Sequence, residues 1–367
     1  MNEEYKFAVD NIIKWKNGEK IYPYQLLIIP TNGCNLNCLS CLARGQNPYI
    51  PTKELGEGAS LRLIKEATKL KIKFCEIAGG GEPLFAYKKT TSIMRLLKKK
   101  RIKSKIFTNG TIFKNNFLKE MVEISWDIIH FSIDGPNEET HDYIRGKGTF
   151  SKTISNIKKI NSWKQKLRKR KPEIIMATVI THQNHNMIEN MISLCNELQV
   201  HSIYFQAMQI RNKDIGKKIE LAKNDYKSFF ISIKRAQKMA SVYNIDTNLS
   251  QLDRIFIEKS SDIKKLIEID SRISCTWYES IPCFHPWTNI TINAYGQIGV
   301  CPSLAQNSTE YEVGLTSLEE FWYSKELSKL RNSFVKNKIP KICSTCCGNV
   351  VLSNREIRGL LRKKLKE

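Results

Sequence analysis

The chain has 367 residues, enough for one large α/β domain and a smaller appended one. Its apolar content of 41 % is ordinary for a globular protein, and no apolar run is long enough to span a membrane. The first residues have neither the basic start nor the apolar core of a signal peptide, so a cytoplasmic location is expected. In that compartment, the eleven cysteines point to metal ligands rather than disulfides.

The net charge is +23, and two basic runs stand out at 98–105 and 164–171. Each run lies on an expected helix or at a helix end, so a solvated lysine-rich face explains both. The alternative is attraction of an acidic partner such as RNA, a nucleotide-linked sugar or an acidic peptide. Neither run has the interleaved aromatic residues of a single-strand binding track, so nucleic acid is possible but not favoured.

A polar lead-in over 1–24 is followed, from residue 25, by a repeating strand–helix pattern that is typical of βαβ units and a parallel sheet. The expected strands are 25–30, 73–78, 104–108, 126–133, 173–180 and 202–208. The expected helices are 58–70, 87–101, 114–123, 150–165, 186–198 and 223–242. The pattern predicts an α/β fold with an open, partial (β/α)6 barrel over 25–215, whose ligands lie at the C-terminal ends of the strands.

Directly after the first expected strand come Cys34, Cys38 and Cys41, spaced C-x3-C-x2-C. Structural zinc and ordinary ferredoxin-type clusters take four protein ligands, so three thiolates leave such a site one ligand short. The loop therefore suggests a [4Fe–4S] cluster with one open iron, although three buried cysteines or half of a zinc site would show the same spacing. It resembles the cluster loop of the radical S-adenosylmethionine (SAM) enzymes. Many members have an aromatic residue before the third cysteine, where this chain has Ser40.

Polar and glycine-rich segments follow the next two strands. Gly79, Gly80 and Gly81 let the backbone approach a ligand, and Glu82 adds a carboxylate. After a three-cysteine loop, this segment resembles the GGE motif that holds the amino group of SAM. The polar turn after the third strand faces the same end of the barrel, at the C-terminal ends of the strands. The cofactor contacts expected here are Gly80, Gly81, Glu82, Pro83 and Asn109.

The stretch 131–150 contains Ser132 and Asp134-Gly135-Pro136, followed by His141, Asp142 and Arg145. On its own, the Asp–Gly–Pro sequence would be an ordinary turn. The stretch as a whole resembles a segment of radical SAM enzymes that carry a SPASM or twitch extension. That resemblance implies that Ser132 and Asp134 lie near the SAM ribose or methionine. It also implies that Arg145 pairs with the methionine carboxylate, as a guanidinium can do with two hydrogen bonds.

The ends of the fifth and sixth strands carry weaker signals. At the end of the sixth strand, the resemblance gives Met208 an apolar contact with adenine, while core packing is the alternative. After the fifth strand, His182 and His185 are expected to be polar residues at a helix start rather than catalysts.

A Lys- and Glu-rich helical connector is expected over 216–274, a cysteine-rich domain over 275–350 and a basic helix over 351–367. A turn at 293–297 predicts a hairpin of strands 287–293 and 297–301, which would bring Cys283 and Cys301 together. Four cysteines in two pairs fit zinc on their chemistry alone. Downstream of a radical SAM core they resemble the SPASM/twitch extension, here the shorter twitch form (β-hairpin plus helix) with one auxiliary [4Fe–4S] cluster. Its expected ligands are Cys283, Cys301, Cys343 and Cys346.

Four cysteines remain. Cys75 and Cys195 are expected to be packing residues, and Cys347 could replace Cys346 as a ligand. Cys275 is the candidate catalytic thiol, because an epimerase that returns a hydrogen atom to its substrate would need a donor.

The resemblance covers about residues 22–347. It implies that SAM is cleaved reductively to a 5′-deoxyadenosyl radical, which abstracts hydrogen from a substrate, with electrons from an external flavodoxin or ferredoxin. The leading hypothesis is net oxidation of a small or carrier-linked biosynthetic substrate, with the auxiliary cluster as electron acceptor. The second hypothesis is crosslinking, oxidation or epimerisation of a peptide or protein. The third is modification of RNA.

Overall fold

The computed structural model describes residues 3–41, 43, 48–208, 218–222, 224–252, 277–306, 312–314, 316–338, 340–345 and 348–365. In these residues one sheet runs in the order β7-β6-β5-β4-β3-β2-β1-β8-β9, and every pair of neighbours is parallel except β8 with β9. The barrel strands are β1 (Gln25–Ile28), β2 (Phe74–Ile77), β3 (Lys103–Thr108), β4 (Ile128–Ser132), β5 (Glu173–Ile180) and β6 (Ser202–Ala207). Three short strands complete the sheet: β7 (Asp246–Thr247), β8 (Asn289–Ile292) and β9 (Ile298–Gly299).

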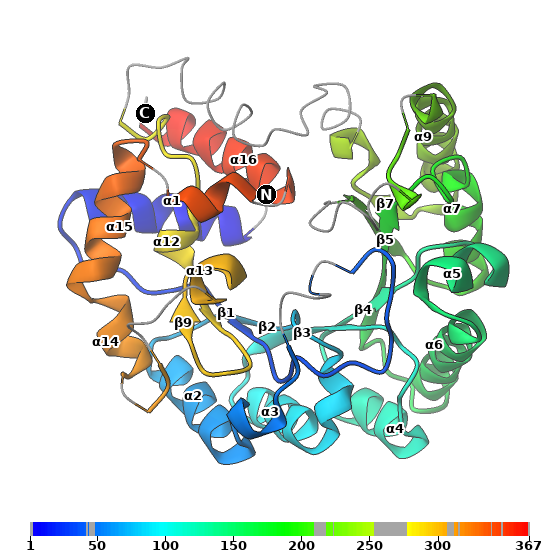
Figure 1. Ribbon diagram of the computed structural model, residues 1–367, viewed down its shortest axis with the longest axis horizontal. Helices are drawn as coiled ribbons and strands as arrows, with labels where there is room; N and C mark the ends of the chain where they lie inside the picture. Colours follow the sequence, from blue (N-terminus) through cyan, green and yellow to red (C-terminus); the bar gives the residue numbers. More distant parts are fainter. Residues whose placement is uncertain are drawn as a thin grey trace.

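Helices cover the convex face of this curved sheet (Figure 1). They are α2 (Glu57–Lys69), α3 (Tyr87–Lys99), α4 (Asn115–Glu123), α5 (Glu138–Arg145), α6 (Thr149–Lys166), α7 (Ile188–Glu197) and α9 (Asp225–Tyr243). In β5, buried side chains such as Met176 and Ile180 alternate with half-buried ones such as Val179. One face of the strand therefore packs against the helices while the other faces the interior of the barrel.

The predicted partial barrel is confirmed, and all six expected strands are present with ends shifted by at most a few residues. Helix α5 was not expected, because its sequence is mostly polar. It is nevertheless well capped, since the Asn137 side chain accepts a hydrogen bond from Thr140 N and two glutamates occupy the first turn. The predicted hairpin is present as β8 and β9. Its parallel pairing with β1 was not predicted, because β1 and β8 are far apart in the chain.

The first and last parts of the chain meet beside β1 and β9 (Figure 1). Here α1 (Glu3–Lys16) packs against α16 (Gly348–Lys364) and α12 (His285–Thr288). Asn11 Nδ2 donates to Tyr22 O at 2.5 Å and to Trp287 O at 2.8 Å. The helices α13 (Pro302–Gln306), α14 (Leu318–Trp322) and α15 (Lys325–Val335) complete this part. Strand β8 continues the barrel sheet, so the sheet does not end where the C-terminal part begins. The domain boundary proposed near residue 275 lies outside the described residues and stays a prediction.

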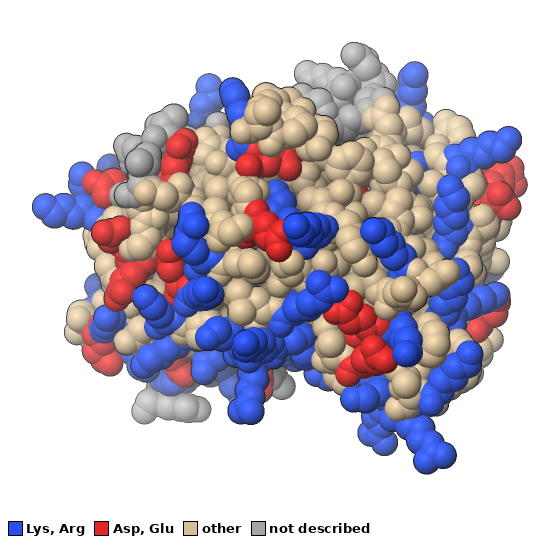
Figure 2. Space-filling view, turned by 90° about the horizontal axis from the view of Figure 1, so that it is seen from below, with Lys and Arg blue, Asp and Glu red and all other residues tan. Residues whose placement is uncertain are grey.

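Lysine and arginine are spread over the face seen in Figure 2, with smaller groups of aspartate and glutamate between them. That mixture favours a solvated surface over a binding track of one sign. None of the described helices is long and apolar enough to cross a membrane.

Candidate functional site

A cavity of about 520 Å³ opens where the barrel strands end. Its wall includes the cysteine loop after β1, the glycine-rich turn after β2, and the ends of β3 and β4. Of the residues predicted from sequence, those that line it are Cys34, Cys38, Cys41, Gly80, Gly81, Glu82, Pro83, Asn109, Ser132 and Arg145. Asp134 lies behind this wall and is fully buried, and Met208 directly follows β6 without lining the cavity. The structure thus brings most of the predicted cofactor contacts together around one space.

Hydrogen bonds fix the cysteine loop from outside and from within. Leu39 N donates to Ile144 O of α5 at 2.8 Å, and within the loop Leu36 N donates to Cys34 Sγ at 3.4 Å. Burial raises the pKa of Cys34, and it raises that of Cys38 to about 11 although the Arg145 charge opposes the shift. Both thiols therefore keep their protons until a cation takes the place of the proton, as thiolate-bound iron does.

The glycine-rich turn presses against the cysteine loop. Gly81 N donates to Thr31 O and Glu82 N donates to Gly33 O, both at 2.9 Å. A Cβ atom on Gly81 would lie 1.9 Å from Gly33 O, so no larger residue fits there. These glycines are needed for contact with the loop that carries the cysteines, beyond any approach to a ligand.

Glu82 is almost fully buried, and its carboxylate accepts three hydrogen bonds. The donors are Thr108 Oγ1 at 2.8 Å, Asn109 N at 2.7 Å and Leu84 N at 3.2 Å. Burial raises the pKa of this carboxyl group, and the hydrogen bonds oppose the shift. Glu82 thus joins the end of β2 to the end of β3, and its predicted contact with the SAM amino group stays a prediction.

Arg145 and Asp134 form a buried ion pair, with Arg145 Nε 2.7 Å from Asp134 Oδ2. The N–H of Nε is not aligned for a hydrogen bond, so the contact is mainly electrostatic. Burial lowers the pKa of Arg145, but the Asp134 charge, the close Asp134 contact and the nearby Cys38 and Cys41 together outweigh this effect and leave that pKa raised. Ser40 Oγ donates to the same carboxylate at 3.3 Å. The serine that stands where many radical SAM enzymes have an aromatic residue therefore links the cysteine loop to this ion pair. Whether Arg145 also pairs with the methionine carboxylate stays a prediction.

The second group of predicted ligands lies in the C-terminal part. Cys283 precedes α12, Cys301 follows β9, and Cys343 lies in the short helix η3 (Lys341–Thr345); all three are half-buried. Burial and the charge of Cys301 raise the pKa of Cys343 to about 11.

The remaining cysteines divide into two sets. Cys75 and Cys195 are buried, which confirms the prediction that they pack in the core. The other three lie outside the described residues: Cys275, Cys346 and Cys347.

A second cavity, of about 410 Å³, is lined by side chains of the barrel strands and of the C-terminal part. Phe107 lines both cavities, and Cys301 lines the second one. The wall of the second cavity is polar, since Glu76 forms an ion pair there with Lys105. Among the described residues, His130 Nδ1 and Asn289 Oδ1, also in this wall, have no hydrogen-bond partner. The cavity can therefore hold a polar molecule.

Three residues at the rim were not assigned a role from the sequence. Thr108 bonds Glu82, Asn184 Nδ2 donates to Asp134 O at 2.9 Å, and His141 Nδ1 accepts from Asp134 N at 3.3 Å. Thr108 and Asn184 are polar residues at or just after the ends of strands, which is the signal that could have identified them. They act by positioning the predicted site residues.

Two family models match the chain. The model of the radical SAM superfamily matches residues 28–195, and that of an iron–sulfur cluster-binding domain, SPASM, matches 283–347. The AdoMet-dependent heme synthase of Methanosarcina barkeri is 25 % identical over 91 % of this chain and 93 % of its own length. A tungsten-containing aldehyde ferredoxin oxidoreductase cofactor-modifying protein of Pyrococcus furiosus is 26 % identical, over 43 % of this chain and only 44 % of its own.

Solved structures share the fold. SuiB of Streptococcus suis bound to S-adenosylmethionine superposes with a TM-score of 0.61 at 18 % identity, over 93 % of this chain and 73 % of that one. Native anSMEcpe with bound AdoMet gives a TM-score of 0.58 at 18 % identity, over 90 % and 89 % of the two chains. Three cysteines that line one large cavity agree with the cluster that the family implies.

Proposed function

We propose that the chain is a radical SAM enzyme with a C-terminal SPASM-type domain, because the two family models match 28–195 and 283–347, and that it oxidises a small or carrier-linked polar substrate by two electrons. The family implies a SAM-binding [4Fe–4S] cluster and an auxiliary cluster. When bound, these groups supply the electron that cleaves SAM to methionine and a 5′-deoxyadenosyl radical, and the acceptor for the second substrate electron. The substrate loses one hydrogen atom, which forms 5′-deoxyadenosine, and then a proton and an electron.

In this proposal the chain contributes binding and orientation. Cys34, Cys38 and Cys41 hold the first cluster, and Cys283, Cys301, Cys343 and Cys346 hold the second. Arg145 holds the SAM carboxylate, because a buried guanidinium lining the cavity is a strong partner for it. Asp134 keeps that guanidinium oriented from behind through their 2.7 Å contact. Glu82 fixes the neighbouring strand ends that form the opposite wall.

One observation supports this proposal above the others: the polar cavity inside the barrel adjoins the SAM cavity and has one of the predicted auxiliary-cluster ligands in its wall. It shares Phe107 with the SAM cavity and has Cys301 in its wall. A substrate there would be near the adenosyl radical on one side and near an electron acceptor on the other. The polar lining of this cavity favours a substrate with hydroxyl, amino or carboxylate groups over an apolar one.

The test uses anaerobically reconstituted enzyme. We expect about eight irons per chain, and about four in Cys301→Ala, because only the auxiliary site loses a ligand. Cys301→Ala should still form 5′-deoxyadenosine with dithionite but should lose substrate oxidation. Cys195→Ala, which alters a buried thiol on α7, is the matched control and should keep all its iron. About four irons and one zinc in the unaltered enzyme would rule out the auxiliary cluster.

A second candidate function is the modification of a peptide. A structural relative is SuiB of Streptococcus suis bound to precursor peptide SuiA, with a TM-score of 0.61, and the sporulation killing factor maturation protein SkfB of Bacillus subtilis is 27 % identical over 45 % of this chain. A short open reading frame for a precursor peptide beside the gene would favour this function. If the product is an epimer, Cys275→Ala should still cleave SAM but should form no epimer.

A further inference from the structure

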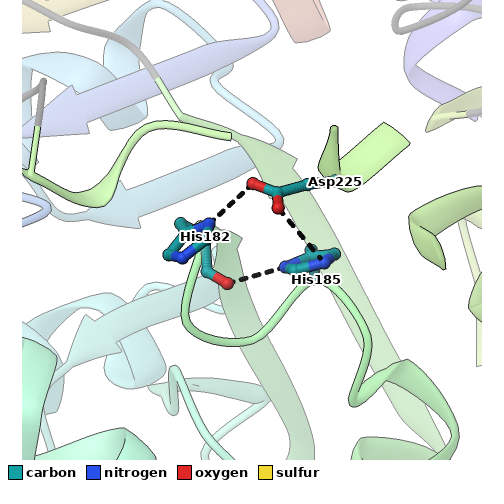
Figure 3. Close-up of side chains that lie close together, drawn as sticks. All are labelled: His182, His185 and Asp225. Atoms are coloured by element: carbon teal, nitrogen blue, oxygen red, sulfur yellow. Dashed lines mark hydrogen bonds and ion pairs between the residues drawn. The ribbon is translucent and has the colours of Figure 1, made fainter. Parts of the chain in front are cut away.

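Two imidazoles and a carboxylate meet on the same rim of the barrel, outside the cavity described above. His182 and His185 lie in the turn between β5 and α7, and Asp225 is the first residue of α9. Figure 3 shows both rings directed at the Asp225 carboxylate. The potential ligand atoms of the three side chains all lie within 4.8 Å of one another.

The spacing of these atoms is close to that of a metal site. His182 Nδ1 lies 2.7 Å from Asp225 Oδ2, and His185 Nε2 lies 3.7 Å from Asp225 Oδ1. Two ligands that are each about 2.0 Å from a tetrahedral zinc are roughly 3.3 Å apart. The two observed distances, each to a different oxygen of the carboxylate, lie on either side of that value, so small side-chain rotations would bring both ring nitrogens and the carboxylate onto one ion.

His185 is oriented as a ligand would be. Its Nδ1 lies 2.6 Å from His182 O, and a carbonyl oxygen can only accept, so the proton is on Nδ1. In the neutral ring, the lone pair is then on Nε2, which points toward Asp225 and Ser228. A hydrogen bond from the second ring nitrogen to a backbone carbonyl is how proteins commonly fix the tautomer of a metal-bound histidine.

Asp225 supplies a negative charge that has no full counter-charge nearby. It is 8 % exposed, and among the described residues no lysine or arginine lies within ion-pair distance of it. Burial raises its pKa, but the His182 hydrogen bond and the Ala222 N–H outweigh this effect and leave the pKa lowered, so the group is ionised at neutral pH. The His182 side chain is 53 % exposed, which leaves one side of the cluster open to water.

We propose that His182, His185 and Asp225 form a Zn²⁺ site, with water as the fourth ligand. Two imidazoles and one carboxylate suit zinc, and the ion would replace the proton between His182 and Asp225. The site would link the β5–α7 turn to α9. That turn also carries Asn184, whose side chain donates to Asp134 O at 2.9 Å, so the ion would stabilise the rim behind the SAM cavity. This inference does not depend on the reaction proposed above.

The test is zinc binding by the cluster-loaded holoenzyme. The enzyme is incubated with ZnCl2, passed through a desalting column and analysed for metal. We expect about one zinc per chain in the unaltered enzyme and at least a tenfold loss of affinity in Asp225→Asn and His185→Gln. The matched control is His201→Gln, which removes an exposed imidazole from the turn before β6 and should bind zinc as before.

Zinc X-ray absorption separates this site from the cysteine sites. A zinc bound by His182, His185 and Asp225 has only nitrogen and oxygen neighbours near 2.0 Å, whereas a thiolate site shows sulfur near 2.3 Å. If the buried substitutions fail to fold, His182→Gln alters an exposed side chain and provides the same comparison. Lack of zinc retention, a sulfur shell, or unchanged binding in all three variants would each overturn the proposal.

Discussion

Glu82 and Asp134 are both buried carboxylates at strand ends, but different forces stabilise them. Glu82 accepts hydrogen bonds from Thr108, Asn109 and Leu84, which are neutral groups. Asp134 instead contacts the Arg145 guanidinium and accepts from Val179 N at 2.8 Å. Removing Glu82 would leave buried donors unpaired, whereas removing Asp134 would leave a buried positive charge without its counter-ion. A change at either residue therefore acts on stability as well as on cofactor binding.

Two buried histidines and one half-buried histidine make the stability of the protein dependent on pH. Burial lowers the pKa of His130 to about 3 and the pKa values of His141 and His285 to about 4. In the unfolded chain these groups titrate near pH 6.5. Between about pH 6.5 and 4 the unfolded state binds more protons, so the free energy of unfolding should fall as the solution is acidified. The slope is up to about 1.4 kcal/mol per pH unit for each histidine.

His130→Gln should flatten this dependence, because it removes one of the three groups. The measurement is Tm at pH 7.0 and 5.5 for the holoenzyme and the variant. His201→Gln, at an exposed site, should keep the slope of the unaltered enzyme. An equal slope in His130→Gln would mean that His130 does not contribute.

The sequence alone located the site residues better than it located the residues that form hydrogen bonds with them. Cys34, Glu82 and Arg145 follow or lie between strands in an order that the motifs identify. The contacts of Ser40 with Asp134, and of Asn184 with the same residue, join segments 94 and 50 residues apart. Such contacts depend on how the strands assemble, which local patterns do not encode.

At the scale of elements, the turn after β2 is fitted to the cysteine loop. Gly81→Ala should displace that loop, since the added Cβ would meet Gly33 O at 1.9 Å. We expect a loss of about 1–3 kcal/mol in the free energy of unfolding and a fall in the iron bound at the first cluster site. The measurements are Tm and iron content after reconstitution.

Gly58→Ala is the matched control, because Gly58 is exposed in the first turn of α2 and a Cβ there meets nothing within 4 Å. This variant should keep its iron and gain up to about 1 kcal/mol, since alanine is the better helix former. Normal iron content and Tm in Gly81→Ala would show that the turn can move away from the loop.

The barrel strands were predictable because each is a short apolar run followed by a turn. Helix α5 was not, because its stability comes from the Asn137 cap and from contacts with α6 rather than from an apolar stripe. The pairing of β8 with β1 was missed for another reason. The hairpin turn predicts only the antiparallel partner, β9, and the sequence of β8 does not say which edge of the barrel its other side joins.

For the whole molecule, the two neighbours of β1 in the sheet matter most. It pairs with β2 on one side and with β8 on the other, so the barrel and the C-terminal part share one sheet. Asn11 strengthens this junction, because its side-chain amide bonds the backbone just before β1 and the backbone of α12. The barrel and the C-terminal part should therefore unfold together rather than as separate domains.

Asn11→Leu tests this cooperativity, because it leaves the buried carbonyls of Tyr22 and Trp287 without this donor. We expect a loss of about 2 kcal/mol and a Tm lower by a few degrees, still in one calorimetric transition. Hydrogen exchange should show β3 and β8 losing protection to the same extent, since their opening requires the same sheet to separate. Asn17→Ala, at the exposed end of α1, should leave both measurements unchanged. Two transitions, with β3 protected after β8 has opened, would mean that the C-terminal part unfolds on its own and that β1 does not couple the two parts.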